Sequence, residues 1–292
     1  SDDSDGDEIQ ALVNSWKDRR IKYFKNPNRQ APGANRDFLI SQADGDFIKF
    51  LFDDDLLMPH SLEYSLVAAE KTDADLVFHG KNIIDANGRV ISSPSVEDPG
   101  KIIVVKPQYY FERMVGNCKN LIGEPTNLLI RTKTLKAIAR PFDLDGNRMR
   151  FLTDMALYTN FMHRSLKVVG MSYIGSSFRK HISQSSSIQT SRNSNSYNPI
   201  YSAGIFEWEL LLRWSIYRGH ITIDTYLNGI EKRLNRYRDC VNIYPELNLF
   251  INLEGSGDFG CYYNKKYKQV LEQAYRIIEF NQKKLKQEVP NE

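Results

Sequence analysis

Apolar residues recur with two different periods along the first half of the chain. In residues 8–17, Ile9, Leu12, Val13 and Trp16 lie on one face at helical spacing, which predicts an amphipathic helix. Similar patterns predict helices at 35–43, 59–70 and 150–163, and short apolar runs predict strands at 20–24, 46–52, 74–79 and 167–173. Strands that alternate with helices indicate an α/β domain with a mainly parallel sheet.

A Ser- and Asn-rich stretch separates this half from a more helical part. Residues 183–198 contain almost no apolar side chain, which is typical of a flexible loop or linker. Beyond it, the spacing predicts helices at about 201–218, 222–238 and 264–287. We therefore predict an α/β domain over 1–190 and a helical region over 191–292. Within the α/β domain, Asn87-Gly88 predicts a hairpin turn.

Composition and charge exclude several classes of protein. The chain has 292 residues, of which 41% are hydrophobic and 26% charged, an ordinary globular balance. A formal net charge of +3 lacks the concentrated positive charge of a nucleic-acid-binding protein, so we expect no nucleic-acid partner. Three widely spaced cysteines offer no C-x-x-C metal motif and indicate reduced thiols in a cytoplasmic protein. No apolar run approaches the roughly 18 residues that a membrane span needs.

Three consecutive carboxylates follow the predicted strand at 46–52. Asp53, Asp54 and Asp55 repel one another, and a cation that neutralises them removes this cost. Mg²⁺ and Mn²⁺ suit such a site because they prefer oxygen ligands and often share them with substrate phosphates. Ligands of open α/β sheets bind beyond the carboxyl ends of the strands, where this cluster lies. The alternative is an acidic turn in which Asp55 caps the next helix.

A fourth carboxylate, Asp154, lies within the predicted helix at 150–163 among apolar neighbours. Partial burial there would raise its pKa toward that of a useful general base. The alternative is a carboxylate at a helix start, where the positive end of the helix dipole stabilises its charge.

Two further polar segments are candidates for ligand binding. Phe178-Arg179-Lys180-His181 precedes the polar stretch and could clamp a diphosphate, or it could be an ordinary basic loop. Residues 2–6 (DDSDG) precede the first predicted helix, where a disordered start with an N-cap is the simpler interpretation.

Taken together, the order and spacing of these segments resemble the inverting family-2 glycosyltransferases, which have the GT-A fold, a mixed, mainly parallel sheet flanked by helices. The resemblance covers about residues 1–187. It rests on Asp2 to Gly6, Gly33-Ala34-Asn35-Arg36, Ala43 to Leu51, Asp53 to Pro59, Asp154 and Phe178 to His181. Gly123-Glu124-Pro125-Thr126 also resembles the segment that lines the acceptor side in this family.

The resemblance implies a role for each matched residue. On the donor side, it implies nucleotide contacts from Asp3 and diphosphate or donor contacts from Asn35, Asp53, Arg179 and His181. The metal, Mn²⁺ or Mg²⁺, would be bound by Asp54, Asp55 and His181, with Asp54 the principal ligand. On the acceptor side, it implies contacts from Glu124, Pro125 and Thr126, with Asp154 removing the proton of the acceptor hydroxyl.

The implied reaction is transfer of a sugar from a nucleotide diphosphate sugar, a UDP-sugar, with inversion at the anomeric carbon. The implied acceptor is a glycan or a lipid-linked molecule of surface polysaccharide assembly. The family normally has a strand, a helix and a second strand before the acidic motif that opens this chain, so we expect a fragment. A non-catalytic sugar- or nucleotide-binding remnant, or an interaction module, is the alternative. A nucleotidyltransferase is disfavoured because no G-x-G-[ST]-R phosphate loop occurs.

The predicted C-terminal helices carry apolar faces that allow two interpretations. Trp208, Leu211, Leu212 and Ile216 lie among charged residues, and the last helix sets apolar residues opposite lysines. Such helices could dock on the inner face of an anionic membrane, which would make the protein peripheral there. The favoured alternative is packing on the catalytic domain or on a second subunit of a homo-oligomer.

Overall fold

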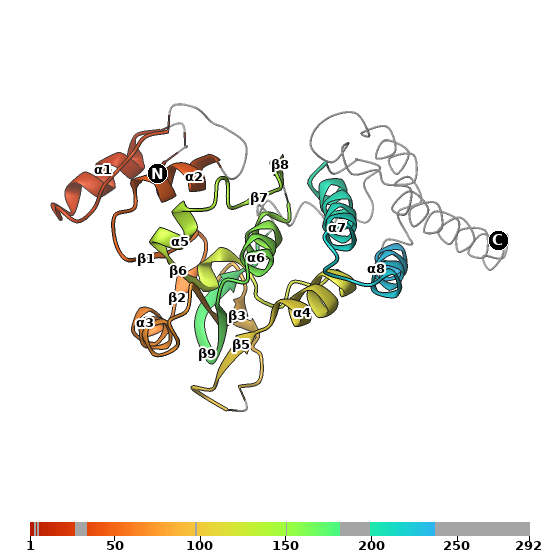
Figure 1. The fold of residues 1–292 in the computed structure, drawn as a ribbon. Helices are drawn as coiled ribbons and strands as arrows, with labels where there is room; N and C mark the ends of the chain where they lie inside the picture. Colours follow the sequence, from red (N-terminus) through yellow and green to blue (C-terminus); the bar gives the residue numbers. More distant parts are fainter. Residues whose placement is uncertain are drawn as a thin grey trace, which may run out of the picture.

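The structure is a computed structural model that describes residues 1–2, 4, 6–26, 34–96, 98–149, 151–181 and 199–236 (Figure 1). The α-helices and strands of the N-terminal part, residues 1–181, are α1 (Glu8–Ser15), α2 (Ala34–Gln42), β1 (Phe47–Lys49), β2 (Leu56–Leu57), α3 (Ser61–Thr72), β3 (Leu76–Ile84), β4 (Val90–Ser92), β5 (Ile102–Val105), α4 (Pro107–Tyr109), β6 (Leu128–Arg131), α5 (Thr132–Lys136), β7 (Asp143–Leu144), β8 (Asn147–Arg148), α6 (Thr153–His163) and β9 (Val168–Arg179). Two helices follow, α7 (Pro199–Tyr217) and α8 (Ile223–Arg236).

A mixed sheet forms the centre of the molecule. Its strands follow the order β1-β6-β3-β9-β2, with β4 paired to β3 and β5 paired to β9. Helix α3 packs on one face through Ala68 and Ala69, and α6 packs on the other. Figure 1 shows the sheet between these two helices. The predicted mixed sheet with flanking helices is thus present.

The prediction that the sheet is mainly parallel is wrong for the described strands. Only β3 and β9 pair in parallel among them, and the other described pairs of this sheet are antiparallel. Antiparallel strands can be joined by short turns, whereas parallel strands need a long crossover. A sequence pattern identifies strands and helices, but it does not tell which strands become neighbours. The Asn87-Gly88 hairpin is confirmed, because it joins β3 to β4, with Gly88 at a φ of 84°.

Several element boundaries differ from the prediction. The strand expected at 46–52 is confined to β1, because Phe50 turns into the core and the chain then enters the turn at Asp53. No described strand forms at 20–24, where only an isolated bridge joins Asp2 to Lys25. Helix α1 is confirmed, but none of its side chains is buried, and Leu12 is 60% exposed.

Helix α7 shares its core with the N-terminal part. Trp208, Leu211 and Leu212 are buried in the same apolar cluster as Leu157 and Phe161 of α6. These three residues therefore pack on the N-terminal part, as the favoured interpretation of their apolar face expected. The predicted linker at 183–198 and the helix at 264–287 lie outside the described residues. Among the described helices, none combines the length and apolar character that a bilayer crossing requires.

Candidate active site

The acidic turn and the end of β9 meet because β2 and β9 pair as antiparallel neighbours. Leu56 lies opposite Ser177, so the residues just before β2 are beside those that end β9. The Asp55 carboxylate is buried and accepts a hydrogen bond from the backbone N–H of Arg179 at 3.3 Å. Burial raises the pKa of Asp55 above its usual range. Asp53, in contrast, is exposed at the tip of the turn.

Asp54 points toward the basic segment that the sequence singled out. Its carboxylate Oδ2 lies 3.2 Å from Nε2 of His181, and both side chains are about one-quarter exposed. The Arg179 Nε donates to the backbone oxygen of Asp54 at 2.9 Å. The predicted residues Asp54, Arg179 and His181 are therefore brought together from segments more than 120 residues apart.

This arrangement offers two side chains to a divalent cation. In the described part of the chain, no group of three or more His, Cys, Asp or Glu side chains converges as a metal cluster. Asp55 is engaged with the backbone of Arg179, which leaves Asp54 and His181 as the converging pair. One carboxylate and one imidazole fit Mn²⁺ or Mg²⁺ when substrate phosphates supply further ligands.

Asp154 lies at the start of α6, as its second residue, and not in the middle of a helix. The helix begins at Thr153 because the preceding backbone N–H groups of Phe151 and Leu152 bond to a side chain, the carboxylate of Glu207 on α7, at 2.8 and 2.5 Å. Despite its place near the positive end of the helix, burial raises the pKa of Asp154 to about 6. A carboxylate with this pKa can accept a proton near neutral pH.

Hydrogen bonds and cations fix the Asp154 carboxylate. Its Oδ1 accepts from the backbone N–H of Met155 at 2.8 Å, and its Oδ2 accepts from Nδ2 of Asn120 at 2.5 Å. The positive charges of Arg36 and Lys81 oppose the effect of burial and lower its pKa. Burial lowers the pKa of Lys81 to about 8, and the charges of Asp154 and Asp55 act against that shift. Lys81 is therefore within electrostatic reach of both carboxylates.

The predicted acceptor segment adjoins this carboxylate. Glu124 forms an ion pair with Lys81, while Pro125 and Thr126 are buried. The hydroxyl Oγ1 of Thr126 accepts from the backbone N–H of Phe52 at 3.3 Å, which ties the acceptor segment to the acidic turn. Of the three predicted residues, Glu124 is the charged one, and its side chain is partly accessible.

The two remaining donor-side residues are placed less completely. Asn35 lies in the first turn of α2 and donates through Nδ2 to the backbone oxygen of Ser1 at 3.4 Å. Asp3 lies outside the described residues. Its neighbour Asp2 is buried, and hydrogen bonds from Ser4, Tyr23 and Lys25, in this order of effect, hold its pKa well below the usual range.

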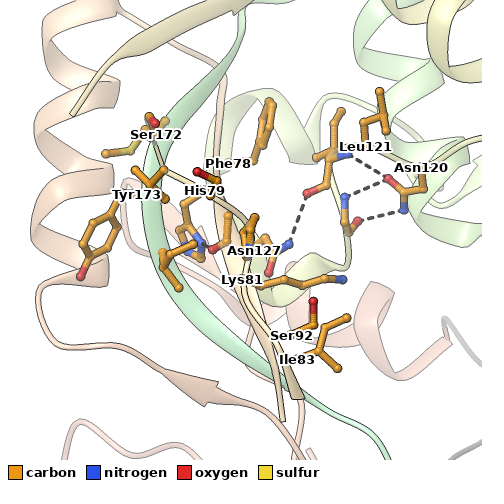
Figure 2. A pocket seen from close by; sticks show the side chains of 18 residues that line it. Phe78, His79, Lys81, Ile83, Ser92, Asn120, Leu121, Asn127, Ser172 and Tyr173 are labelled. Carbon is orange, nitrogen blue, oxygen red and sulfur yellow. Dashed lines mark hydrogen bonds between the residues drawn. The ribbon is translucent and has the colours of Figure 1, made fainter. Parts of the chain in front are cut away.

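A cavity of about 490 Å³ opens next to the acceptor segment (Figure 2). Phe78, Lys81, Asn120 and Gly123 belong to its lining, so it borders the groups that surround Asp154. Sequence reasoning missed Lys81 and Asn120, and it matched Arg36 within the Gly33–Arg36 segment without giving it a role. For Asn120, the available signal was the Asn-x-x-Gly spacing of residues 120–123, which is typical of a tight loop.

Comparison with known proteins agrees with this geometry. Residues 1–139 match the family model described as Glycosyl transferase family 2. A GalNAc(5)-diNAcBac-PP-undecaprenol beta-1,3-glucosyltransferase from Campylobacter jejuni is 34% identical over 93 residues, or 31% of this chain and 29% of that protein. An uncharacterized glycosyltransferase from Methanocaldococcus jannaschii is 30% identical over 123 residues, or 42% of this chain and 39% of that protein. The matches span less than half the length of these relatives.

The fold is similar to that of a solved structure. The crystal structure of S. aureus TarS 1-349 superposes with a TM-score of 0.51 at 13% identity, covering 81% of this chain and 61% of that chain. At an identity this low, the superposition is evidence for the fold alone. It confirms the predicted GT-A architecture. Residues 1–139, a little under half of the chain, are therefore similar to glycosyl transferase family 2, and the sheet and helices follow the architecture expected from that similarity.

Proposed function

We propose that this chain transfers a sugar from a nucleotide diphosphate sugar, a UDP-sugar, to an acceptor hydroxyl with inversion. The observation that carries the proposal is the pair of sites joined by Lys81. Lys81 interacts electrostatically both with Asp154, a carboxylate with a pKa of about 6, and with Asp55 of the acidic turn. A base and a diphosphate site must both reach the anomeric carbon, and this cation is within reach of both.

The chemistry follows as a single displacement. The acceptor oxygen forms its bond to the anomeric carbon as the bond from that carbon to the diphosphate oxygen breaks, and Asp154 takes the acceptor proton. Attack from the face opposite the leaving group inverts the anomeric configuration. Asn120 and Met155 keep the carboxylate in one orientation, which lowers the entropy cost of reaching the transition state.

A divalent cation would be held by Asp54 and His181 together with the phosphates of the donor. When bound, Mn²⁺ or Mg²⁺ neutralises the charge that develops on the departing diphosphate. Arg179 keeps Asp54 in place through the Asp54 backbone oxygen. Asp55, buried beneath the turn, acts as a support for this site.

The acceptor class follows from the relative with a specific name. The C. jejuni protein is described as a glucosyltransferase for an undecaprenol-linked glycan. We extend this class to the present chain and propose a glycan or lipid-linked acceptor in surface glycan assembly.

Calorimetric titration with UDP tests the proposal in its donor half. We expect UDP to bind in the presence of MnCl₂ and to lose affinity when EDTA removes the metal. Asp54→Ala should weaken this metal-dependent binding by about tenfold or more, whereas Asp73→Asn, at an exposed aspartate between α3 and β3, is a control that removes a carboxylate with no assigned role.

The catalytic half of the proposal is tested with Asp154→Asn and a panel of UDP-sugars. We expect this variant to bind UDP nearly as the unchanged protein does, while UDP release from the UDP-sugar falls by roughly 10²- to 10⁴-fold. Equal loss of UDP binding in Asp154→Asn and Asp54→Ala would contradict the assigned roles. Binding of UDP without turnover of any UDP-sugar would favour the non-catalytic alternative.

A further inference from the structure

Asn120 has contacts that no sequence motif accounts for. We propose that Asn120 is a positioning residue of the transfer reaction, one that orients Asp154 and locks the acceptor segment to it. The inference rests on the proposed function, because it assigns Asn120 a task in the same reaction.

Both the oxygen and the nitrogen of the Asn120 side-chain amide form hydrogen bonds. Its Oδ1 accepts from the backbone N–H groups of Ile122 at 3.1 Å and Gly123 at 2.9 Å. Its Nδ2 donates to the backbone oxygen of Gly123 at 3.1 Å and to Oδ2 of Asp154 at 2.5 Å. Two donors face the oxygen and two acceptors face the nitrogen, so only one orientation of the amide satisfies all four. Figure 2 shows the amide of Asn120 with its bonds into this loop.

The loop that Asn120 closes is held from a second side. The Tyr158 hydroxyl, one turn after Asp154 on α6, donates to the backbone oxygen of Gly123 at 2.6 Å. Gly123 has a φ of 98°, which only glycine adopts without strain. Helix α6 therefore contacts the loop of residues 120–123 at two points. Tyr158 bonds to Gly123, the first residue of the acceptor segment, and Asp154 bonds to Asn120.

These contacts fix the position of the acceptor segment relative to Asp154. Glu124, the next residue of that segment, pairs with Lys81, the cation that also acts on Asp154. Asn120, Gly123 and Lys81 all line the cavity of about 490 Å³. A group that enters the cavity touches the same amide that orients the carboxylate.

Hydrogen-bond donation also has a chemical effect. A donor to the ionised carboxylate favours its charged form and opposes the effect of burial. Without Nδ2, we expect Asp154 to hold its proton to a higher pH and to point less accurately at the acceptor. A loop support without a role in the reaction would leave the protonation of Asp154 unchanged.

The variant Asn120→Asp separates the two tasks. An aspartate keeps an oxygen for the N–H groups of Ile122 and Gly123, so the loop retains two of its three bonds to residue 120 and loses the one from Nδ2 to the Gly123 backbone oxygen. It replaces the donor to Asp154 with a second carboxylate. Asn120→Ala removes both tasks, and Asn117→Asp serves as a control because the Asn117 amide bonds to the backbone of Glu112 and Arg113, not to Asp154.

The measurement is the pH dependence of UDP release from the UDP-sugar that the unchanged protein hydrolyses fastest, with water as the acceptor. We expect Asn120→Asp to move the acidic limb of the rate profile upward by about one pH unit or more. Asn120→Ala should lower kcat by roughly ten- to a hundredfold with UDP affinity changed less than about twofold. An acidic limb in Asn120→Asp that coincides with those of the unchanged protein and Asn117→Asp would overturn the proposal.

A second readout does not depend on turnover. The carboxyl carbon of Asp154, assigned by comparison with Asp154→Asn, is titrated by ¹³C NMR in the full chain and in Asn120→Asp. An upward shift supports the contact even if no UDP-sugar is hydrolysed, in which case the proposed function fails and the positioning of Asp154 stands. An unshifted titration overturns the role of Asn120 whether or not the protein is active.

Discussion

Lys49 forms a polar cluster beneath α3 with His79 and Ser61. Its Nζ lies 2.8 Å from Nε2 of His79, and the Ser61 hydroxyl lies 3.2 Å from the same nitrogen. Nδ1 of His79 is 3.0 Å from the backbone oxygen of Gly80. Burial lowers the pKa of Lys49 to about 7 and that of His79 to about 4. The cluster contains a cation with no acidic partner at these contacts.

Replacing this cation by an apolar side chain should stabilise the protein. In Lys49→Met, the desolvation cost of the ammonium group disappears, while Ser61 can still donate to His79. Because the folded-state pKa of Lys49 is lowered, its cost is greatest at pH 7 and below and vanishes as the pH approaches 10.5. We expect a gain of about 1 kcal/mol at pH 7, or about 2 °C in Tm, and little gain at pH 10.

Thermal unfolding at both pH values checks this prediction, with the exposed Lys101→Met as the control. A loss of stability in Lys49→Met at pH 7 would show that the ammonium group contributes a net favourable contact.

At the residue scale, charge decided what the sequence could predict. Asp54 and Asp154 stood out because charged groups beside apolar runs need a reason, and the structure places Asp54 against His181 and Asp154 against Asn120. Asn120 did not stand out, since a neutral amide in a loop has no periodic pattern and its partner is 34 residues away. Lys81 lies within a strand, where nothing in the sequence distinguishes it from a solvated lysine.

At the scale of elements, the end of β9 connects two turns. The Nη1 of Arg179 donates to the backbone oxygens of Asp85 at 3.2 Å and Ala86 at 3.1 Å, in the β3–β4 hairpin. The Nε of the same guanidinium holds Asp54 in the acidic turn. One planar group with several donors can bridge two loops in this way, which a lysine with a single charged nitrogen cannot reproduce.

This bridge predicts a difference between two substitutions of Arg179. Both Arg179→Lys and Arg179→Ala should weaken metal-dependent UDP binding, because Asp54 loses its support. Since the planar fork is lost in either case, we expect lysine to recover less than half of the free energy that alanine loses. Calorimetry with UDP and MnCl₂ measures both, with Arg164→Lys as a control on an exposed arginine. Full affinity in Arg179→Lys would show that charge alone suffices.

Element predictions succeeded where the cause was local and failed where it was not. The Asn87-Gly88 turn formed its hairpin because glycine there accepts a positive φ. Helix α6 began three residues later than predicted because Glu207, which is distant in sequence, caps it. The sequence pattern could not predict whether strands pair in parallel or antiparallel fashion, because the direction depends on which distant segments become neighbours.

At the scale of the whole molecule, a histidine pair joins the N-terminal part to the C-terminal helices. Nδ1 of His163, the last residue of α6, lies 2.9 Å from Nε2 of His220, in the loop between α7 and α8. The His220 ring stacks on Phe111 with centroids 4.0 Å apart. Burial lowers the pKa of both histidines, that of His220 to about 4. At His163, the nearby cations Arg218 and Arg164 lower the pKa further, whereas the carboxylate of Asp145 raises it.

The histidine pair should make the stability of the protein depend on pH. The folded state prefers neutral rings, so its stability is fully present above the ordinary histidine pKa of about 6.5 and falls as the pH drops toward 4. We expect His220→Phe, which keeps an aromatic ring beside Phe111, to show a smaller loss of unfolding free energy between pH 7.5 and pH 5. The control is His60→Gln, an exposed histidine on another element.

Urea unfolding at the two pH values measures this effect. An equal loss in His220→Phe and in the unchanged protein would place the pH dependence elsewhere.

The cap that Glu207 gives to α6 limits how freely the C-terminal helices can change in evolution. A helix from a related protein could fill the same apolar space and still fail, unless it also brought a carboxylate to the two N–H groups ahead of Asp154. If C-terminal helices were exchanged between relatives, an acidic residue at the position of Glu207 would be needed to keep the carboxylate of Asp154 in place. Helix α7 would in this sense be inherited together with Asp154, the proposed catalytic base.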